Sequence, residues 1–299
     1  MVGAVESLVA INGTSLFTRA VGDGDPLIVL HGGPEFDSFY LMPELDVLEQ
    51  CGRLIYYDQR GRGRSSPSPA RDVTIDSEVA DLEALRQHLG AGPVALLGHS
   101  WGGVLAMEYA ARHPDNVSRL VLLNTAPASN REWREFLSAW RGGRSDSDAA
   151  ALTALTQRPA YAAGEVAADT ELYRIVFRTA SRDPQVCERI VSRLRAQFTP
   201  AKVVDSRVIE DRLQRDTLEH DGYDIASRLS RLRVPTLVVH GAHDFVPVRM
   251  AERIAASIPG SRLEILPNCG HFCYAERPTA VRDVVCGFLH PHRGDLVIE

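Results

Sequence analysis

The sequence predicts an α/β protein in which a mostly parallel sheet is covered by helices on both faces and interrupted by a helical insertion. Strand-like apolar runs alternate with helical stretches from residue 27 to 125, and the rhythm resumes near residue 234. Such alternation is typical of a parallel sheet whose crossover helices cover it. The intervening segment lacks this rhythm and has a mostly helical pattern. We therefore expect a core of residues 1–126 and 231–299 and a helical cap of residues 127–230.

Turn residues and periodicity locate the elements of the core. Asn12-Gly13 is a strong hairpin signal between two apolar runs, and clusters of glycine, proline and serine bound several of the others. We expect strands over residues 7–11, 15–21, 27–33, 53–58, 93–98, 117–125, 234–241 and 261–267. We expect helices over residues 43–52, 74–90, 103–114, 248–260 and 279–289.

Composition narrows the class of protein. The chain has 299 residues, 44% hydrophobic and 24% charged, as in an ordinary globular protein. A net charge of −6 argues against nucleic acid as the main partner, because phosphate binding needs a basic patch. No apolar run approaches the length of a membrane span, and the first residues do not resemble a signal peptide. We expect a cytoplasmic protein, and the oligomeric state stays open.

The five cysteines are odd in number and scattered along the chain. This usage is typical of free thiols in a reducing compartment. Cys269 and Cys273 bracket a histidine, but no second pair of ligands accompanies them, so we expect no metal site.

A Gly-His-Ser-Trp-Gly run at residues 98–102 follows an expected buried strand and opens an expected helix. A nucleophile elbow has this context, because its sharp turn lifts the serine above the sheet and leaves space only for small neighbours. The helix behind Ser100 also directs N–H groups toward an anion. The pattern predicts a nucleophilic serine; a serine N-cap with glycines for close packing is the plainer alternative.

A nucleophilic serine needs a base that is itself oriented by a third group. Asp244 follows the strand expected at residues 234–241, and His271 lies in the loop after the next strand. Their order along the chain, serine then acid then histidine, is that of a nucleophile-elbow hydrolase. We expect Asp244 to be the orienting acid and His271 the base, with neighbouring His243 less suitable.

Attack on a carbonyl also requires donors for the oxyanion. We expect the backbone N–H of Trp101, directly after the serine, to supply one donor. Gly33, in the loop "LIVLHGGPEF" after an early strand, would supply the other. A cis bond between Gly33 and Pro34 suits such a turn.

The runs "HGGP", "YYDQRGRGRS", "GHSWGG", "HGAHDFVP" and "CGH", in this order, resemble the α/β-hydrolase superfamily, and within it the proline iminopeptidases. The resemblance covers about residues 8–126 and 230–290. It implies the α/β-hydrolase fold with an eight-stranded, mostly parallel sheet and a small-molecule or short-peptide substrate under the cap, without a cofactor. It also implies that Asp58 and Arg60 form a structural ion pair near the site.

Two departures from that family concern the substrate. Glu35 stands where the family's loop usually has a further glycine, and Phe245 follows the predicted acid where several members have glutamate. An aminopeptidase must hold the substrate's ammonium with carboxylates. Glu35, or Glu210 or Asp211 in the cap, could supply them, whereas Phe245 favours apolar groups.

The cap offers further candidates. Its aromatic residues could line the pocket or simply pack between helices: Trp133, Trp140, Tyr173 and Phe177. The arginine-rich stretches at residues 178–195 and 207–216 alternate with acids, which indicates an exposed, salt-bridged face.

We therefore expect a serine hydrolase that cleaves a small ester or amide through an acyl-enzyme. Its most specific form resembles a proline iminopeptidase. A carboxylesterase or a carbon–carbon bond hydrolase without aminopeptidase activity is the alternative. A ligand-binding protein that uses the same fold without turnover is a further one.

Overall fold

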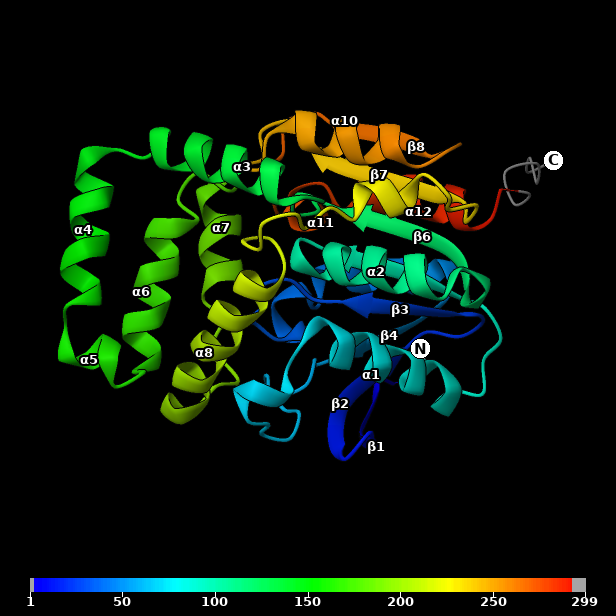
Figure 1. Ribbon diagram of the computed structural model, residues 1–299, viewed down its shortest axis with the longest axis horizontal. Helices are drawn as coiled ribbons and strands as arrows, with labels where there is room; N and C mark the ends of the chain where they lie inside the picture. The colour runs from blue at the N-terminus through cyan, green and yellow to red at the C-terminus, as the bar shows by residue number, and fades with distance from the viewer. Residues whose placement is uncertain (1–2, 292–299) are drawn as a thin grey trace.

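In the computed structural model, which describes residues 3–291, one eight-stranded sheet organises the chain (Figure 1). The strand order is β1-β2-β4-β3-β5-β6-β7-β8. The first three strands in this order pair antiparallel and the others parallel, which confirms the mostly parallel sheet. The strands are β1 (Val5–Ile11), β2 (Thr14–Val21), β3 (Pro26–Leu30), β4 (Arg53–Tyr57), β5 (Val94–His99), β6 (Val117–Leu123), β7 (Thr236–Gly241) and β8 (Arg262–Leu266).

Helices cover both faces of the sheet. Successive residues of a strand point to opposite sides, so apolar strands give the sheet two apolar faces to bury. Ile28 belongs to the apolar cluster on one face and its neighbour Val29 to the cluster on the other. The first face is covered by α1 (Ile75–His88), α2 (Trp101–Arg112) and α10 (Val248–Ser257). The second is covered by η2 (Glu44–Cys51), α11 (Cys273–Glu276) and α12 (Pro278–Leu289), of which η2 winds as 3-10 turns. Shorter 3-10 segments are η1 (Ser38–Leu41), η3 (Ala70–Asp72) and η4 (Pro114–Asn116).

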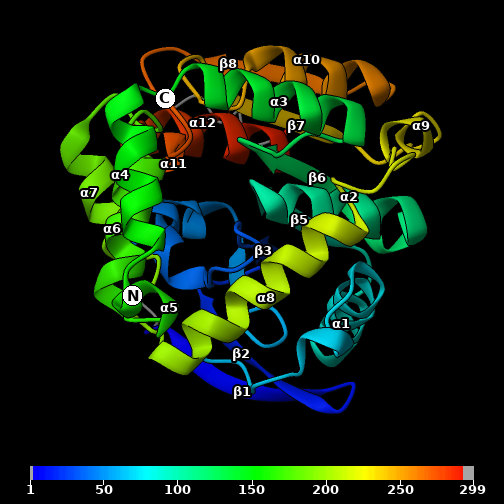
Figure 2. The same cartoon turned by 60° about the vertical axis from the view of Figure 1, so that its left-hand side comes forward.

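The chain between β6 and β7 is helical, as its pattern predicts. It forms α3 (Asn130–Gly142), α4 (Asp146–Thr156), α5 (Pro159–Ala162), α6 (Val166–Val176), α7 (Pro184–Val191), α8 (Pro200–Asp216) and α9 (Ala226–Leu229). In Figure 1 helices α4 to α8 lie beyond the carboxyl ends of the strands. Figure 2 shows α8 crossing in front of that edge of the sheet. Loops at this edge carry the site in open α/β sheets.

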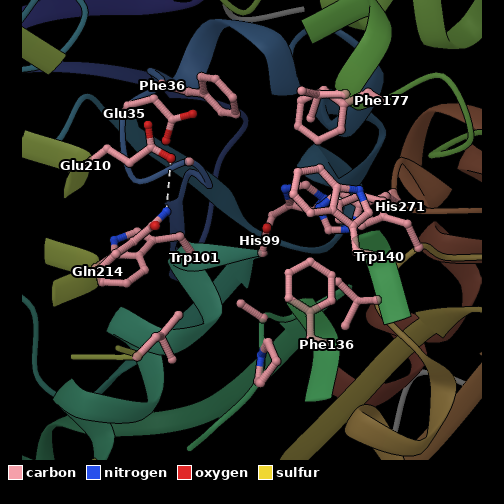
Figure 3. A pocket seen from close by; sticks show the side chains of 18 of the residues that line it. Glu35, Phe36, His99, Trp101, Phe136, Trp140, Phe177, Glu210, Gln214 and His271 are labelled. Carbon is pink, nitrogen blue, oxygen red and sulfur yellow. Dashed lines mark hydrogen bonds between the residues drawn. The ribbon is translucent and has the colours of Figure 1, made fainter. Parts of the chain in front are cut away.

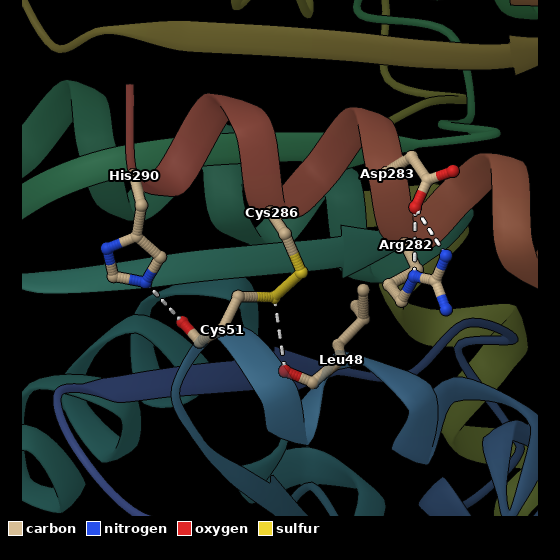
Figure 4. Close-up of a disulfide and its surroundings, with 6 residues drawn as sticks. All are labelled: Leu48, Cys51, Arg282, Asp283, Cys286 and His290. Atoms are coloured by element: carbon tan, nitrogen blue, oxygen red, sulfur yellow. Dashed lines mark hydrogen bonds and ion pairs between the residues drawn. A yellow bond between two sulfur atoms is a disulfide. The ribbon is translucent and has the colours of Figure 1, made fainter. Parts of the chain in front are cut away.

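The expectation that all five cysteines are free is wrong. Cys51 at the end of η2 and Cys286 in α12 form a disulfide, with Cα atoms 5.2 Å apart (Figure 4). The two residues are 235 positions apart and meet because α12 packs on η2, which no local pattern reveals. Cys187, Cys269 and Cys273 are free and buried. The argument for a reducing compartment, which rested on unpaired cysteines, therefore loses its basis.

The described residues contain neither a membrane-spanning helix nor a metal-binding cluster. Among residues 3–291, no helix combines the length and apolar character needed to cross a membrane. Over the same residues, no group of three or more histidine, cysteine and acidic side chains is arranged to hold a metal ion.

Candidate active site

Ser100 occupies the sharp turn between β5 and α2. Its φ of 54° and ψ of −119° lie in a region that a non-glycine residue rarely adopts, which fits the predicted strained turn. Glycines make the turn possible, because a Cβ on Gly98 would overlap the Gly102 carbonyl, and one on Gly102 would overlap the carbonyl of Leu30. Ser100 itself is only partly buried and lines a cavity.

Asp244 and His271 lie in the loops after β7 and β8, as the sequence predicts. The Nδ1 atom of His271 is 3.0 Å from both carboxylate oxygens of Asp244. Asn124, at the end of β6, donates its side-chain N–H to Asp244 Oδ2 at 2.7 Å. Although burial alone would raise the pKa of Asp244, the facing His271 and His240 and these hydrogen bonds lower it. Asp244 is therefore a carboxylate that fixes the orientation of the His271 ring.

A buried hydrogen-bond chain connects the loops around Ser100. His99 Nε2 is 3.0 Å from the His271 carbonyl, which can only accept, so Nε2 carries the proton. Its Nδ1 then accepts from the Tyr40 hydroxyl at 2.7 Å, and that hydroxyl accepts from the Gly32 N–H at 2.8 Å. Burial, together with the nearby His271, lowers the pKa of His99 to about 3, so the ring stays neutral. The chain ties the loop after β3 to the loop after β8.

The two residues predicted to donate to the oxyanion belong to segments that lie beside Ser100. A Cβ on Gly32 would lie 2.9 Å from the Cβ of Ser100, so the loop after β3 passes directly beside the serine. The Gly33–Pro34 bond is cis, as expected, and Gly33 has a φ of 120°. Trp101 is the first residue of α2, where backbone N–H groups have no intrahelical partner.

A cavity of about 210 Å³ opens above these residues, between the sheet edge and the cap. Its walls include Gly33, Ser100, Trp101 and His271. Two chemically different ends are visible in Figure 3. Glu35, Glu210 and Gln214 gather on one side, and Phe136, Trp140, Phe177 and His271 on the other.

Glu35 anchors the acidic end. It is 3% exposed, and its Oε1 accepts a hydrogen bond from the Tyr173 hydroxyl at 2.8 Å. Its Oε2 is buried and has no hydrogen-bond partner among the described residues. Glu210, on α8, accepts from Gln214 at 3.0 Å. Burial raises the pKa of both glutamates, and the charge of Glu35 raises that of Glu210 further.

Arg195 compensates for the buried charge of Glu35. Its Nη1 donates to the Glu35 carbonyl, its Nη2 to the Tyr173 hydroxyl at 3.1 Å, and its Nε to Asp169 at 2.5 Å. The positive charge of Arg195 offsets part of the rise that burial causes in the pKa of Glu35. The expectation of an exposed arginine-rich face is wrong for Arg195, which is fully buried. It holds for Arg189, which is exposed and forms an ion pair with Glu44.

Aromatic rings form the opposite end. The Phe245 ring centroid is 4.5 Å from that of His271, 5.8 Å from Phe177 and 5.9 Å from Phe136. All four aromatic residues singled out in the cap line this cavity: Trp133, Trp140, Tyr173 and Phe177.

Two expectations fail. Asp211 is exposed and does not line the cavity, because its neighbour Glu210 takes the inward side of α8. Asp58 does not pair with Arg60. Asp58 accepts from Ser38 and from the N–H of Arg64, whereas Arg60 reaches Asp81 at 2.6 Å.

Sequence reasoning also missed Asn124, Gln214, Tyr40 and Arg195 as contributors to the site. Each lies outside the runs that carry the family resemblance. Its contacts are with residues distant along the chain, or they depend on how the cap helices pack. Only the helical spacing of Glu210 and Gln214, four residues apart on one face, offered a local signal.

Comparison with known proteins identifies the class. The model of the α/β hydrolase fold family matches residues 25–278, so the chain belongs to this family and is a hydrolase. Within it, the chain is similar to the proline iminopeptidase of Saccharolobus solfataricus, with 28% identity over 91% of this chain and 86% of the relative. The crystal structure of the Mycobacterium smegmatis proline iminopeptidase is 27% identical, covers 96% of this chain and 98% of its own, and has a TM-score of 0.72. A meta-cleavage product hydrolase from Pseudomonas fluorescens, 22% identical over 95% of this chain and 97% of its own, has a TM-score of 0.73 and shares the fold.

Proposed function

We propose that this hydrolase removes an N-terminal residue, proline foremost, from a short peptide through an acyl-enzyme on Ser100. His271, oriented by Asp244, takes the serine proton and returns it to the leaving amine. The N–H groups of Gly33 and Trp101 stabilise the oxyanion. Water then releases the acyl group by the same route in reverse.

One observation carries the aminopeptidase assignment: the acidic end of the cavity. Glu35 Oε2 has no hydrogen-bond partner among the described residues, although it is buried, and Glu210 lies beside it. An unpaired buried carboxylate oxygen costs free energy unless a donor meets it. A substrate ammonium supplies both the donor and the opposite charge. The similarity to proline iminopeptidases supports the same assignment.

The experiment compares hydrolysis of L-proline p-nitroanilide, its N-acetyl derivative and p-nitrophenyl butyrate. We expect release from the free amine and almost none from the acetylated compound. Ser100→Ala should abolish turnover and labelling by a fluorophosphonate. Glu35→Gln and Glu210→Gln should each raise KM for the free amine about tenfold or more, as expected for loss of a charge-assisted contact.

The matched control is Asp211→Asn, which removes an exposed charge one position from Glu210. It should leave KM unchanged. Equal cleavage of the free and acetylated prolyl compounds would refute recognition of the amine.

A carboxylesterase or carbon–carbon bond hydrolase is the second candidate. The aromatic end of the cavity favours it, because Phe245, Phe177 and Phe136 offer an apolar group a large contact surface. Turnover of p-nitrophenyl butyrate without release of proline would select this reading.

A further inference from the structure

A second cavity, of about 150 Å³, lies behind the aromatic end of the first. Three residues, Trp140, Val176 and Phe245, line both cavities. The two cavities therefore adjoin at these three side chains. A substrate that extends past Phe245 would place its far end in this outer cavity.

The outer cavity has a net positive lining. Arg178 pairs with Asp148 at 3.2 Å, so these two charges largely cancel. The guanidinium of Arg144 lies over the Trp140 ring, 4.1 Å from its centroid. Its Nη2 is buried and has no hydrogen-bond partner among the described residues. Arg144 is thus a partly buried cation held in place by an aromatic ring and able to accept an anion.

The chemistry of the proposed reaction sets the direction of the substrate. His271 must protonate the leaving amine, so the leaving group lies beside His271. Phe245 contacts that ring, and the outer cavity begins behind Phe245. The acyl residue, with its ammonium, extends the other way toward Glu35 and Glu210.

We infer that Arg144 forms a subsite for the C-terminal carboxylate of the substrate, so that the enzyme prefers dipeptides and similarly short peptides with a free carboxylate. This inference rests on the proposed function and adds the class of leaving group to it. The substrate would lie between acidic residues at its amino end and an arginine at its carboxyl end. Long peptides and carboxyl-blocked peptides would lose the second contact.

The test compares kcat/KM for L-prolyl-L-phenylalanine and for its C-terminal amide. The native enzyme should prefer the free acid about tenfold, the effect of one hydrogen bond to a charged group. The difference should lie in KM. Arg144→Met should reduce the preference to about twofold or less. The half-exposed position of Arg144 predicts little change in Tm.

The matched control is Arg141→Met, an exposed arginine in the last turn of α3, shortly before Arg144 in the chain, which should keep the native ratio. Equal kcat/KM for acid and amide in the native enzyme would overturn the subsite while leaving the aminopeptidase intact. A preference that survives Arg144→Met would overturn it as well. Cleavage of p-nitrophenyl butyrate with neither prolyl compound cleaved would overturn both proposals.

Discussion

At the scale of single residues, the acidic end of the cavity is the most informative feature. Two carboxylates share one end of the cavity, and burial raises the pKa of each. Each therefore retains a proton at pH values where an ordinary glutamate is ionised. A cation bound between them reverses this, because it favours the ionised form of both.

The pH dependence of substrate binding follows from this. For L-proline p-nitroanilide, KM should fall as pH rises through the raised pKa values of Glu35 and Glu210, because the carboxylates gain charge. KM should rise again when the substrate amine loses its proton, at about pH 8 for an ordinary α-amino group. With p-nitrophenyl butyrate, which has no amine, we expect that KM does not fall as pH rises through this range. Matching KM profiles for the two substrates would contradict the role of the pair.

The sequence predicts the position of a site residue well where that residue directly follows a strand. Ser100, Asp244 and His271 could be located because parallel strands bring their carboxyl ends to one edge. Asn124 could not, because its contact with Asp244 spans 120 positions. Arg195 lies in a run that alternates charge, and only the packing of α6 and the loop after β3 shows that it is buried.

At the scale of elements, α2 packs closely against the end of β3 at the turn that carries Ser100. Gly102 lets α2 approach the end of β3, since the space a side chain would need is occupied by the Leu30 carbonyl. The sequence predicts this elbow, the hairpin at Asn12-Gly13 and the core helices, because turn residues and apolar periodicity mark each of them locally. It did not predict the order or packing of α3 to α9, whose contacts are mostly with distant segments.

Substitution of Gly102 tests this contact. Gly102→Ala should lower the free energy of unfolding by about 1–3 kcal/mol, the usual cost of overpacking, and should lower kcat through displacement of Ser100. Gly92→Ala is the control, because a Cβ there meets nothing within 4 Å. Thermal unfolding and the rate on p-nitrophenyl butyrate measure both effects. Equal Tm and activity for the two variants would show that α2 has room to move.

At the scale of the whole molecule, one disulfide joins an early segment of the core to its last helix. The Cys51–Cys286 disulfide closes a loop of 235 residues between η2 and α12, on the face opposite α1 and α2. A cross-link of this kind restricts the unfolded chain and typically stabilises a protein by about 2–4 kcal/mol.

Thiol counting tests the link directly. The denatured, unreduced protein should show three reactive thiols, those of Cys187, Cys269 and Cys273, and five after reduction. The double variant Cys51→Ala/Cys286→Ala should show three thiols under both conditions and a lower Tm. Five thiols without reduction would show that the pair is open in the purified protein.

The Arg195 cluster limits how freely the cap can be exchanged between relatives. Glu35 is encoded in the core, but Tyr173 and Arg195, which bind it and balance its charge, are encoded within residues 127–230. A chimera with a foreign cap would leave the Glu35 carboxylate buried without that hydrogen bond or cation. Its amine preference would return only when the tyrosine and arginine were transplanted with the glutamate. In this chain, the loop after β3 and the cap therefore depend on each other.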